Sequence, residues 1–142
     1  MRTNIINKAL LYKDILVKHN YDFSKIIKEE LPENFIDDFF YKLKPFCLER
    51  NQKLTRYLIL KYQNALNWQL MSAYQELEED IIELKYKEVN WYFISENQKL
   101  SMNFIKKWQN YLDYFSLLKN TYFTKMEIEW IRMTLNPIKP IE

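Results

Sequence analysis

The chain of 142 residues contains no glycine. At the usual frequency of ~7%, a chain of this length carries about ten. Loops that cradle phosphates, dinucleotide-binding turns and nucleophile elbows use glycine for close backbone approach or for a positive φ. The absence of glycine therefore argues against the enzyme classes built on these motifs, and we expect a protein without catalytic residues.

Cysteine and histidine are nearly absent as well. Cys47 is the only cysteine, which excludes an intramolecular disulfide and a multi-cysteine zinc site. His19 is the only histidine, so Ser-His or Cys-His catalysis and a His-based metal site would all depend on it. We interpret Cys47 as a packed small hydrophobe and His19 as a residue that ends a helix, and we expect neither a metal nor a cofactor.

Long apolar runs are also missing. No stretch approaches the roughly 20 apolar residues of a membrane span. Lys8 and Asp14 interrupt the N-terminal segment where a secretory signal would have its apolar core. A single thiol is typical of a reducing compartment. We therefore expect an intracellular protein that is neither secreted nor inserted in a membrane.

The residues that are present predict a folded protein whose charge lies in blocks. Hydrophobic residues make up 48% of the chain, aromatic residues 17% and charged residues 28%, which is too apolar for a disordered protein. Residues 39–75 carry a net charge of +5, residues 76–98 a net charge of −5, and residues 99–126 a net charge of +4. This alternation argues against one continuous basic surface built for nucleic acid.

A repeat of 23 residues runs along the chain. Its first position is apolar and its sixth is isoleucine in five successive copies; the first column is Leu31, Leu54, Leu77, Leu100 and Phe123, and the second is Ile36, Ile59, Ile82, Ile105 and Ile128. Further columns keep the same register, so the similarity is not confined to two positions. Such a period is the sequence signature of a helical repeat, and the two columns are candidate core positions.

Each repeat reads as two short helices, a first of about eleven residues and a second of about nine. Side chains that cap helix N-termini precede both: Thr55, Ser101 and Thr124 before first helices, the last with Glu127 as a capping box, and Asn67, Asn90 and Asp113 before second helices. Pro45 and Pro137 fall at the first helical position. Helices this short are marginal alone, so they must pack on their neighbours. We predict an all-α small helical solenoid or compact helical array.

We expect a single helical-repeat domain over residues 1–142. Residues 1–30 form N-terminal cap helices, one over residues 3–19 begun by Thr3 and a shorter one opened by Asp22. Repeats follow at 31–53, 54–76, 77–99 and 100–122. Residues 123–142 are a truncated repeat and tail, in which a helix beginning at Pro137 is stopped by Pro140.

The run NWYFISENQKLSMNFI, residues 90–105, resembles a short repeat, roughly L-S-x-x-F-I followed by N-W-x-x-I-S-x-x-Q-K, found in many proteins of large double-stranded DNA viruses and some large phages. The resemblance covers residues 31–122 well and the flanks weakly. The repeat at 31–53 departs from it, with Lys44-Pro45 in place of Asn-Trp and Glu49 in place of Ser. The resemblance implies a viral or phage origin, a location in the host cytoplasm or the virion, and a non-enzymatic module.

Glutamine recurs near the end of the second helix, at Gln52, Gln75 and Gln98, with Thr121 at the equivalent position of the fourth repeat. The spacing places these amides on the inner face, where an unpaired amide would cost about 1–3 kcal/mol. We therefore hypothesise that each bonds the backbone at a neighbouring helix end, in place of a glycine cap. Ser72 and Ser95, on the same face, would be small so that helices approach closely.

Aromatic and acidic residues have plain structural interpretations. Trp68 and Trp91 recur at the start of second helices and Trp108 shares a column with Phe39 and Tyr62, so we expect core packing rather than base stacking. The acidic run contains Glu79 and Glu83, which are one helical turn apart and could gather a divalent ion. We expect instead a solvated or partner-facing acidic surface at a helix N-terminus.

The best surface candidate for a partner is a basic set: Lys42, Lys44, Arg50, Lys53, Arg56 and Lys61. An acidic protein surface or a phosphate backbone would suit it. We expect a protein that binds a viral or host protein, as a small virion component, an assembly accessory or an inhibitor of a host factor, with homo-oligomerisation as a further option. The alternative is nucleic-acid binding along the basic segments 42–61 and 99–125.

Overall fold

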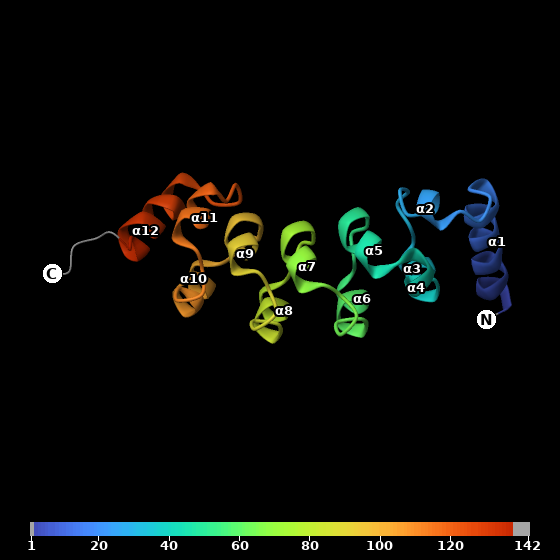
Figure 1. Cartoon of the computed structure of the whole chain (residues 1–142), viewed down its shortest axis with the longest axis horizontal. Helices are drawn as coiled ribbons and strands as arrows, with labels where there is room; N and C mark the ends of the chain where they lie inside the picture. Colours follow the sequence, from blue (N-terminus) through green and yellow to red (C-terminus); the bar gives the residue numbers. More distant parts are fainter. Residues whose placement is uncertain (1, 138–142) are drawn as a thin grey trace. The chain divides into compact units, whose positions relative to one another are not determined.

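A computed structural model describes residues 2–137, and that part of the chain is entirely helical, with twelve helices and no strand (Figure 1). The predicted all-α class is confirmed. Contacts divide the chain into an N-terminal half, Met1–Asn67, and a C-terminal half, Trp68–Glu142, and each half is described by itself. The single repeat domain stays a prediction.

The helices are short except at the two ends. The N-terminal half contains α1 (Arg2–Lys18), α2 (Phe23–Ile26), α3 (Glu33–Asp38), α4 (Phe40–Leu43), α5 (Pro45–Asn51) and α6 (Arg56–Lys61). The C-terminal half contains α7 (Trp68–Tyr74), α8 (Glu79–Leu84), α9 (Trp91–Asn97), α10 (Met102–Trp108), α11 (Tyr114–Lys119) and α12 (Lys125–Leu135).

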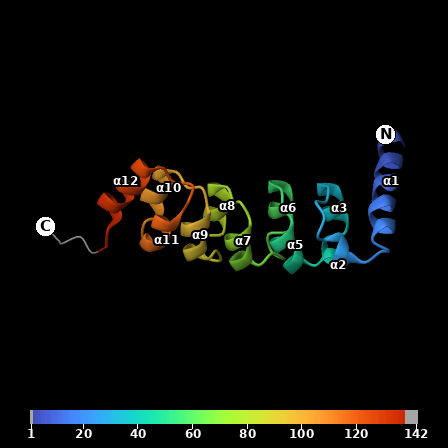
Figure 2. The same cartoon turned by 90° about the horizontal axis from the view of Figure 1, so that it is seen from above.

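Within each half the helices form two rows. In the C-terminal half, α7, α9 and α11 lie side by side in one row, and α8 and α10 lie in the other (Figures 1 and 2). The N-terminal half repeats this arrangement, with α2 and α5 in one row and α3, α4 and α6 in the other. Neighbours in a row come from successive repeats, so each repeat buries its apolar side against the next.

Helix boundaries follow the 23-residue interval. First helices begin at residues 33, 56, 79, 102 and 125, and second helices begin at residues 45, 68, 91 and 114. The preceding helix α2 begins at residue 23, 22 residues before α5 and so one residue short of the interval. The repeat in the sequence is therefore also a repeat in the positions where helices start.

The predicted lengths are wrong for the helices between the two ends, whereas the first helix α12 has the expected 11 residues. First helices α6, α8 and α10 have 6 or 7 residues, not eleven, and second helices α5, α7, α9 and α11 have 6 or 7, not nine. Turns occupy the residues between them, and at Phe39 the first helix of repeat 31–53 divides into α3 and α4. At the N-terminus α1 begins at Arg2 rather than with Thr3 as its cap, and α2 has only 4 residues. Residues 138–142, with Pro140 in the predicted final helix, lie outside the described residues.

Six of the predicted capping residues cap their helices as expected. Thr55, Ser101 and Thr124 each accept a backbone N–H in the first turn, and Thr124 forms the full capping box with Glu127. Asn90 and Asp113 cap α9 and α11 in the same way, and Asp22 caps α2. Each bond satisfies an amide that the helix itself leaves without a partner.

The repeated apolar columns form the core. Leu31, Leu54, Leu77 and Leu100 are buried, as are Ile36, Ile59, Ile82 and Ile105. Phe123 and Ile128 in the last repeat are half-buried. The periodicity therefore identified buried positions correctly wherever a further repeat follows.

Backbone positions that favour glycine are filled by other residues. Lys44 has φ 64°, and Asn20 and Tyr21, directly after α1, have φ 51° and 59°. Asparagine tolerates this left-handed region, whereas lysine and tyrosine are disfavoured there by their Cβ atoms. The tight turn at Lys44 is followed at once by Pro45, which starts α5 with a pre-set φ.

Candidate functional site

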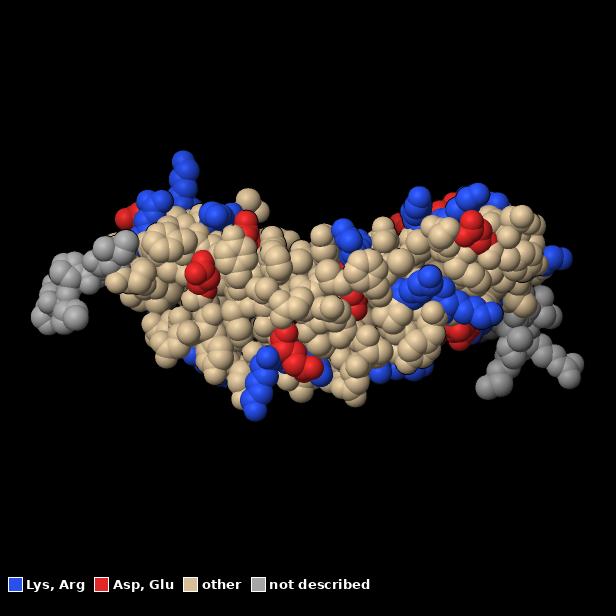
Figure 3. All heavy atoms as spheres, in the orientation of Figure 1, with Lys and Arg blue, Asp and Glu red and all other residues tan. Residues whose placement is uncertain are grey.

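The predicted basic set is exposed, but it is spread over several elements of the N-terminal half. Lys42 lies on α4, Lys44 in the following turn, Arg50 on α5, Lys53 in the next turn, and Arg56 and Lys61 on α6. The Arg50 guanidinium lies 5.6 Å from the centre of the Phe46 ring, and the Lys42 ammonium lies 5.9 Å from that of Phe23. Figure 3 shows basic side chains interspersed with acidic ones on the visible face of each half.

Lys61 holds two helices together. Its ammonium lies 2.7 Å from a carboxylate oxygen of Asp37 on α3, and the same oxygen accepts the Tyr62 hydroxyl at 2.6 Å. These hydrogen bonds, first that of Lys61, lower the pKa of Asp37, and burial followed by the bond to Asp37 raises the pKa of Tyr62 to about 12. Lys61 therefore has a structural role that sequence reasoning missed.

Gln52 and Gln98 have the role that was hypothesised for the glutamine column. Gln98 Nε2 donates to the carbonyl oxygens of Ser72 and Gln75, at 3.1 and 2.7 Å, and its Oε1 accepts the backbone N–H of Leu77 at 2.8 Å. In the N-terminal half, Gln52 bonds the carbonyls of Ile27 and Glu29 and the N–H of Leu31 in the same pattern, the last at 3.1 Å. Gln75, at 5% exposure, is buried like the other two.

In the fourth repeat the equivalent hydrogen bonds come from Asn120 and not from Thr121, the residue that aligns with the glutamine column. Asn120 Nδ2 donates to the carbonyl oxygens of Ser95 and Gln98 at 2.9 and 2.8 Å. Thr121 is exposed. Because α11 is one residue shorter than α9, the inward-facing position falls one residue earlier. The alignment by a fixed interval could not reveal this shift.

Ser72 and Ser95 are small, but their main contribution is hydrogen bonding. The Ser72 hydroxyl donates to the Trp68 carbonyl at 2.6 Å and accepts the N–H of Asn90 at 3.0 Å. Ser95 makes the same pair of bonds with Trp91 and Asp113. Each serine thus satisfies the N–H of the residue that caps the next helix of its row.

Glu49 occupies the serine column in repeat 31–53. Its Oε1 accepts the backbone N–H of Asn67 at 2.5 Å, and its side chain is only 1% exposed. Burial raises the pKa of Glu49, because removal from water disfavours the charged form. The departure from serine that the sequence shows at this position therefore places an ionisable group in the core.

The acidic and aromatic side chains that were candidate site residues form contacts between neighbouring repeats. Glu83 accepts the Trp108 indole N–H at 3.1 Å and pairs with Lys107, and these bonds, the indole first, lower its pKa. Glu79 accepts the backbone N–H of Ser101. Trp68 is buried as expected, whereas Trp91 is half-buried and stacks at 5.4 Å on Trp108, so it forms the edge of the core rather than its centre.

His19 lies directly after α1, and Cys47 lies on α5. The His19 Nε2 atom lies 3.0 Å from a carboxylate oxygen of Glu29, and Cys47 is a half-buried free thiol. Among the described residues no group of three or more His, Cys, Asp or Glu side chains is placed to hold a metal ion. In the same residues no helix is both long and apolar enough to span a membrane.

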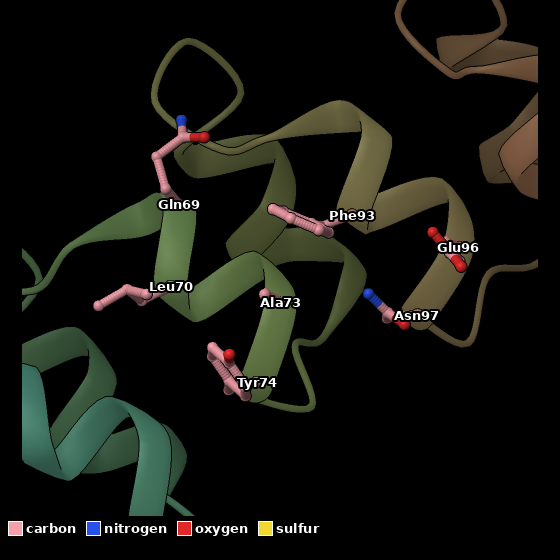
Figure 4. A pocket seen from close by; sticks show the side chains of 7 residues that line it. All are labelled: Gln69, Leu70, Ala73, Tyr74, Phe93, Glu96 and Asn97. Carbon is pink, nitrogen blue, oxygen red and sulfur yellow. The ribbon is translucent and has the colours of Figure 1, made fainter.

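An open groove lies between α7 and α9 in the C-terminal half (Figure 4). Its volume is about 390 Å³, and its lining consists of Gln69, Leu70, Ala73, Tyr74, Phe93, Glu96 and Asn97. Tyr74 is 54% exposed, while Leu70, Ala73 and Phe93 are half-buried. The groove thus offers aromatic and aliphatic surface to solvent, with polar groups at its ends.

Hydrogen bonds hold the two walls of the groove together. Gln69 Nε2 donates to the Glu88 carbonyl at 3.2 Å, and Gln69 Oε1 accepts the Asn90 amide at 2.7 Å, which ties α7 to the start of α9. At the other end, Gln98 binds the carbonyls of Ser72 and Gln75. The groove therefore exists before any partner arrives.

Sequence reasoning missed the groove, although the columns contain one signal of it. Ala73 stands where the other repeats have Arg50, Glu96 and Lys119. A methyl group in a column of long charged side chains leaves space beside the helix.

Comparison of the chain with protein-family models, with curated proteins and with solved structures finds no match.

Proposed function

We propose that the chain acts by binding another protein. The observation that carries this proposal is the groove between α7 and α9, in which aromatic and aliphatic side chains lie open to solvent on walls fixed by hydrogen bonds. Exposed aromatic residues are enriched at protein interfaces, where their burial supplies much of the binding energy. Rigid walls reduce the entropy that a partner must lose on binding.

Exposed aromatic side chains also lie outside the groove, on α9 and α11. Tyr92 on α9 and Phe115 on α11 share one repeat position and are 46% and 55% exposed. The repeat therefore presents aromatic rings to solvent at a regular interval, which supports a binding surface larger than one groove. A viral or phage origin, and a role as a virion component or as an inhibitor of a host factor, belong to this proposal and follow from the resemblance of residues 31–122 alone.

The test is affinity capture of the tagged chain from cells that express it, after chemical crosslinking and nuclease digestion. A Tyr74→Ser variant is compared with Tyr122→Ser, which removes a ring of similar exposure, 51% against 54%, outside the groove. We expect a protein that the wild type and Tyr122→Ser retain and that Tyr74→Ser loses.

Two outcomes would overturn the proposal. One is that no protein is retained by the wild type beyond the background of an untagged control. The other is that everything retained disappears after nuclease digestion and that retention falls steeply with salt. The second result would favour nucleic-acid binding by segments 42–61 and 99–125, which contain the exposed basic set and Lys99, Lys106, Lys107, Lys119 and Lys125.

A further inference from the structure

We propose that the groove between α7 and α9 receives a lysine or arginine side chain from the partner protein. This inference rests on the proposed function and names the chemistry that the partner must present. It follows from the shape of the groove, from the rings that line it, and from one carboxylate at its end.

The shape comes from Ala73. Equivalent helix positions carry Arg50, Glu96 and Lys119, whose side chains are long and charged. At residue 73 the side chain stops at Cβ, so the surface between Tyr74 and Phe93 is hollowed to about 390 Å³ (Figure 4). Other repeats therefore place a long charged side chain at the position of Ala73. In this repeat a partner can supply such a side chain to the space beside Ala73.

The walls suit the alkyl stem of such a side chain. Leu70, Ala73 and Phe93 contribute apolar surface, and Tyr74 contributes an exposed ring. Lysine and arginine bury their methylene groups along apolar surface while the charged head stays at a polar end. A cation near an aromatic ring also gains a favourable interaction with the face of that ring.

The Glu96 carboxylate is the group that would pair with the positive charge of the partner's side chain. Glu96 is half-buried on α9, and among the described residues it forms no ion pair and no side-chain hydrogen bond. The Asn97 amide lies beside it in the groove (Figure 4) and likewise forms no side-chain hydrogen bond within the described part of the chain. A guanidinium or ammonium group would pair with the carboxylate and donate to the amide oxygen.

The sequence segment that contains the α9 wall of the groove has a net charge of the matching sign. Residues 76–98, which include α8 and α9, carry a net charge of −5. Such a segment attracts a cationic partner and raises its rate of association. An anionic segment or a phosphate group would be repelled by Glu96, so the groove selects against nucleic acid.

The experiment pans a random peptide library against the immobilised full chain and then measures the affinity of enriched peptides by fluorescence polarisation. We expect enriched peptides to carry Lys or Arg next to an apolar residue. Ala73→Arg, which places in the groove the residue that α5 has at this position, should abolish binding. Glu96→Gln should weaken it by about tenfold, since it removes the charge and keeps the shape.

Glu129→Gln is the matched control, because Glu129 is an exposed carboxylate on α12 outside the groove, and it should leave the affinity unchanged. Circular dichroism confirms that each variant is folded. Because position 73 carries arginine or lysine in other repeats, Ala73→Arg is compatible with the fold.

The inference fails if the enriched peptides lack a cationic residue, if binding persists in Ala73→Arg, or if Glu96→Gln and Glu129→Gln behave alike. Those results leave the proposed function intact whenever the crosslinking capture still identifies a partner. If that capture identifies none, the proposed function itself fails, so the two failures are distinguishable.

Discussion

At the scale of single residues, side-chain amides bond the backbone groups at helix ends, where other helical proteins often use a glycine cap. Gln52, Gln98 and Asn120 each satisfy backbone groups of the preceding repeat. The sequence predicted that the glutamine column is buried and paired, because its spacing places it on the inner face. The partner atoms could not be predicted, since they belong to another repeat and depend on how the two repeats pack.

Gln98→Leu should lower the free energy of unfolding by about 2–3 kcal/mol, because it leaves the buried N–H of Leu77 and two carbonyls without partners. Urea denaturation followed by circular dichroism measures the change. Gln109→Leu is the control, since Gln109 is exposed at the end of α10 and its side chain, among the described residues, bonds only the Lys106 carbonyl of that helix. Equal stability of the two variants would contradict the structural role of Gln98.

Glu49 makes stability depend on pH. Because its pKa is raised in the folded state, folding favours the protonated form, and the wild type should lose stability as pH rises through that raised pKa. Glu49→Gln mimics the protonated form, so its advantage over the wild type should grow as pH rises from the ordinary pKa of a glutamate carboxyl through the raised pKa. Urea midpoints of both proteins across this range give the measurement.

Glu129→Gln, at an exposed carboxylate, should show no such trend. A constant difference between Glu49→Gln and the wild type at every pH would show that burial does not perturb Glu49.

At the scale of helices, carboxylates join successive first helices. Asp37 on α3 binds Lys61 and Tyr62, and Glu83 on α8 binds Lys107 and Trp108. The two sets are 46 residues apart, twice the repeat interval. The sequence predicted where helices begin, because caps are local, but it overestimated their lengths, because the turns that end them depend on tertiary packing.

Asp37→Asn should destabilise the chain by about 1–2 kcal/mol at neutral pH, since it removes the charge that binds Lys61 and Tyr62. The pKa of Asp37 is lowered in the folded state, so its contribution is present above the ordinary pKa and disappears as pH falls through the lowered value. Thermal unfolding at several pH values tests this dependence.

Asp14→Asn provides the comparison, because Asp14 is an exposed carboxylate on α1. A loss of stability in Asp37→Asn that stays the same in acid would show that charge is not the cause.

At the scale of the whole molecule, the interval of 23 residues predicted the all-helical class and the core positions correctly. It did so because the same apolar columns recur at Leu54, Leu77 and Leu100. The groove between α7 and α9 was not predicted, because it arises where one repeat differs from the others, at Ala73. A consensus describes what the repeats share, whereas a binding surface depends on where they differ.

Ile105→Ala should destabilise the C-terminal half locally. Ile105 is fully buried, and removal of its side chain costs about 2–5 kcal/mol. Because each repeat packs on its neighbours, amide exchange should accelerate in α8 to α11 and stay slow in α3 and α4. Hydrogen–deuterium exchange with mass spectrometry resolves these segments.

Ile36→Ala, at an equivalent position of the N-terminal half, should give the reverse pattern. Uniform acceleration along the chain in both variants would show a single cooperative unit instead.

The amides that reach back to the preceding repeat also bear on how quickly the chain folds. In the described residues, Gln52, Gln98 and Asn120 bond backbone atoms between 21 and 26 positions earlier along the chain. Contacts of such short sequence separation require only small loops to close, and low contact order accompanies rapid folding. We therefore expect refolding on the microsecond-to-millisecond scale typical of helical proteins, with growth from any repeat that forms first.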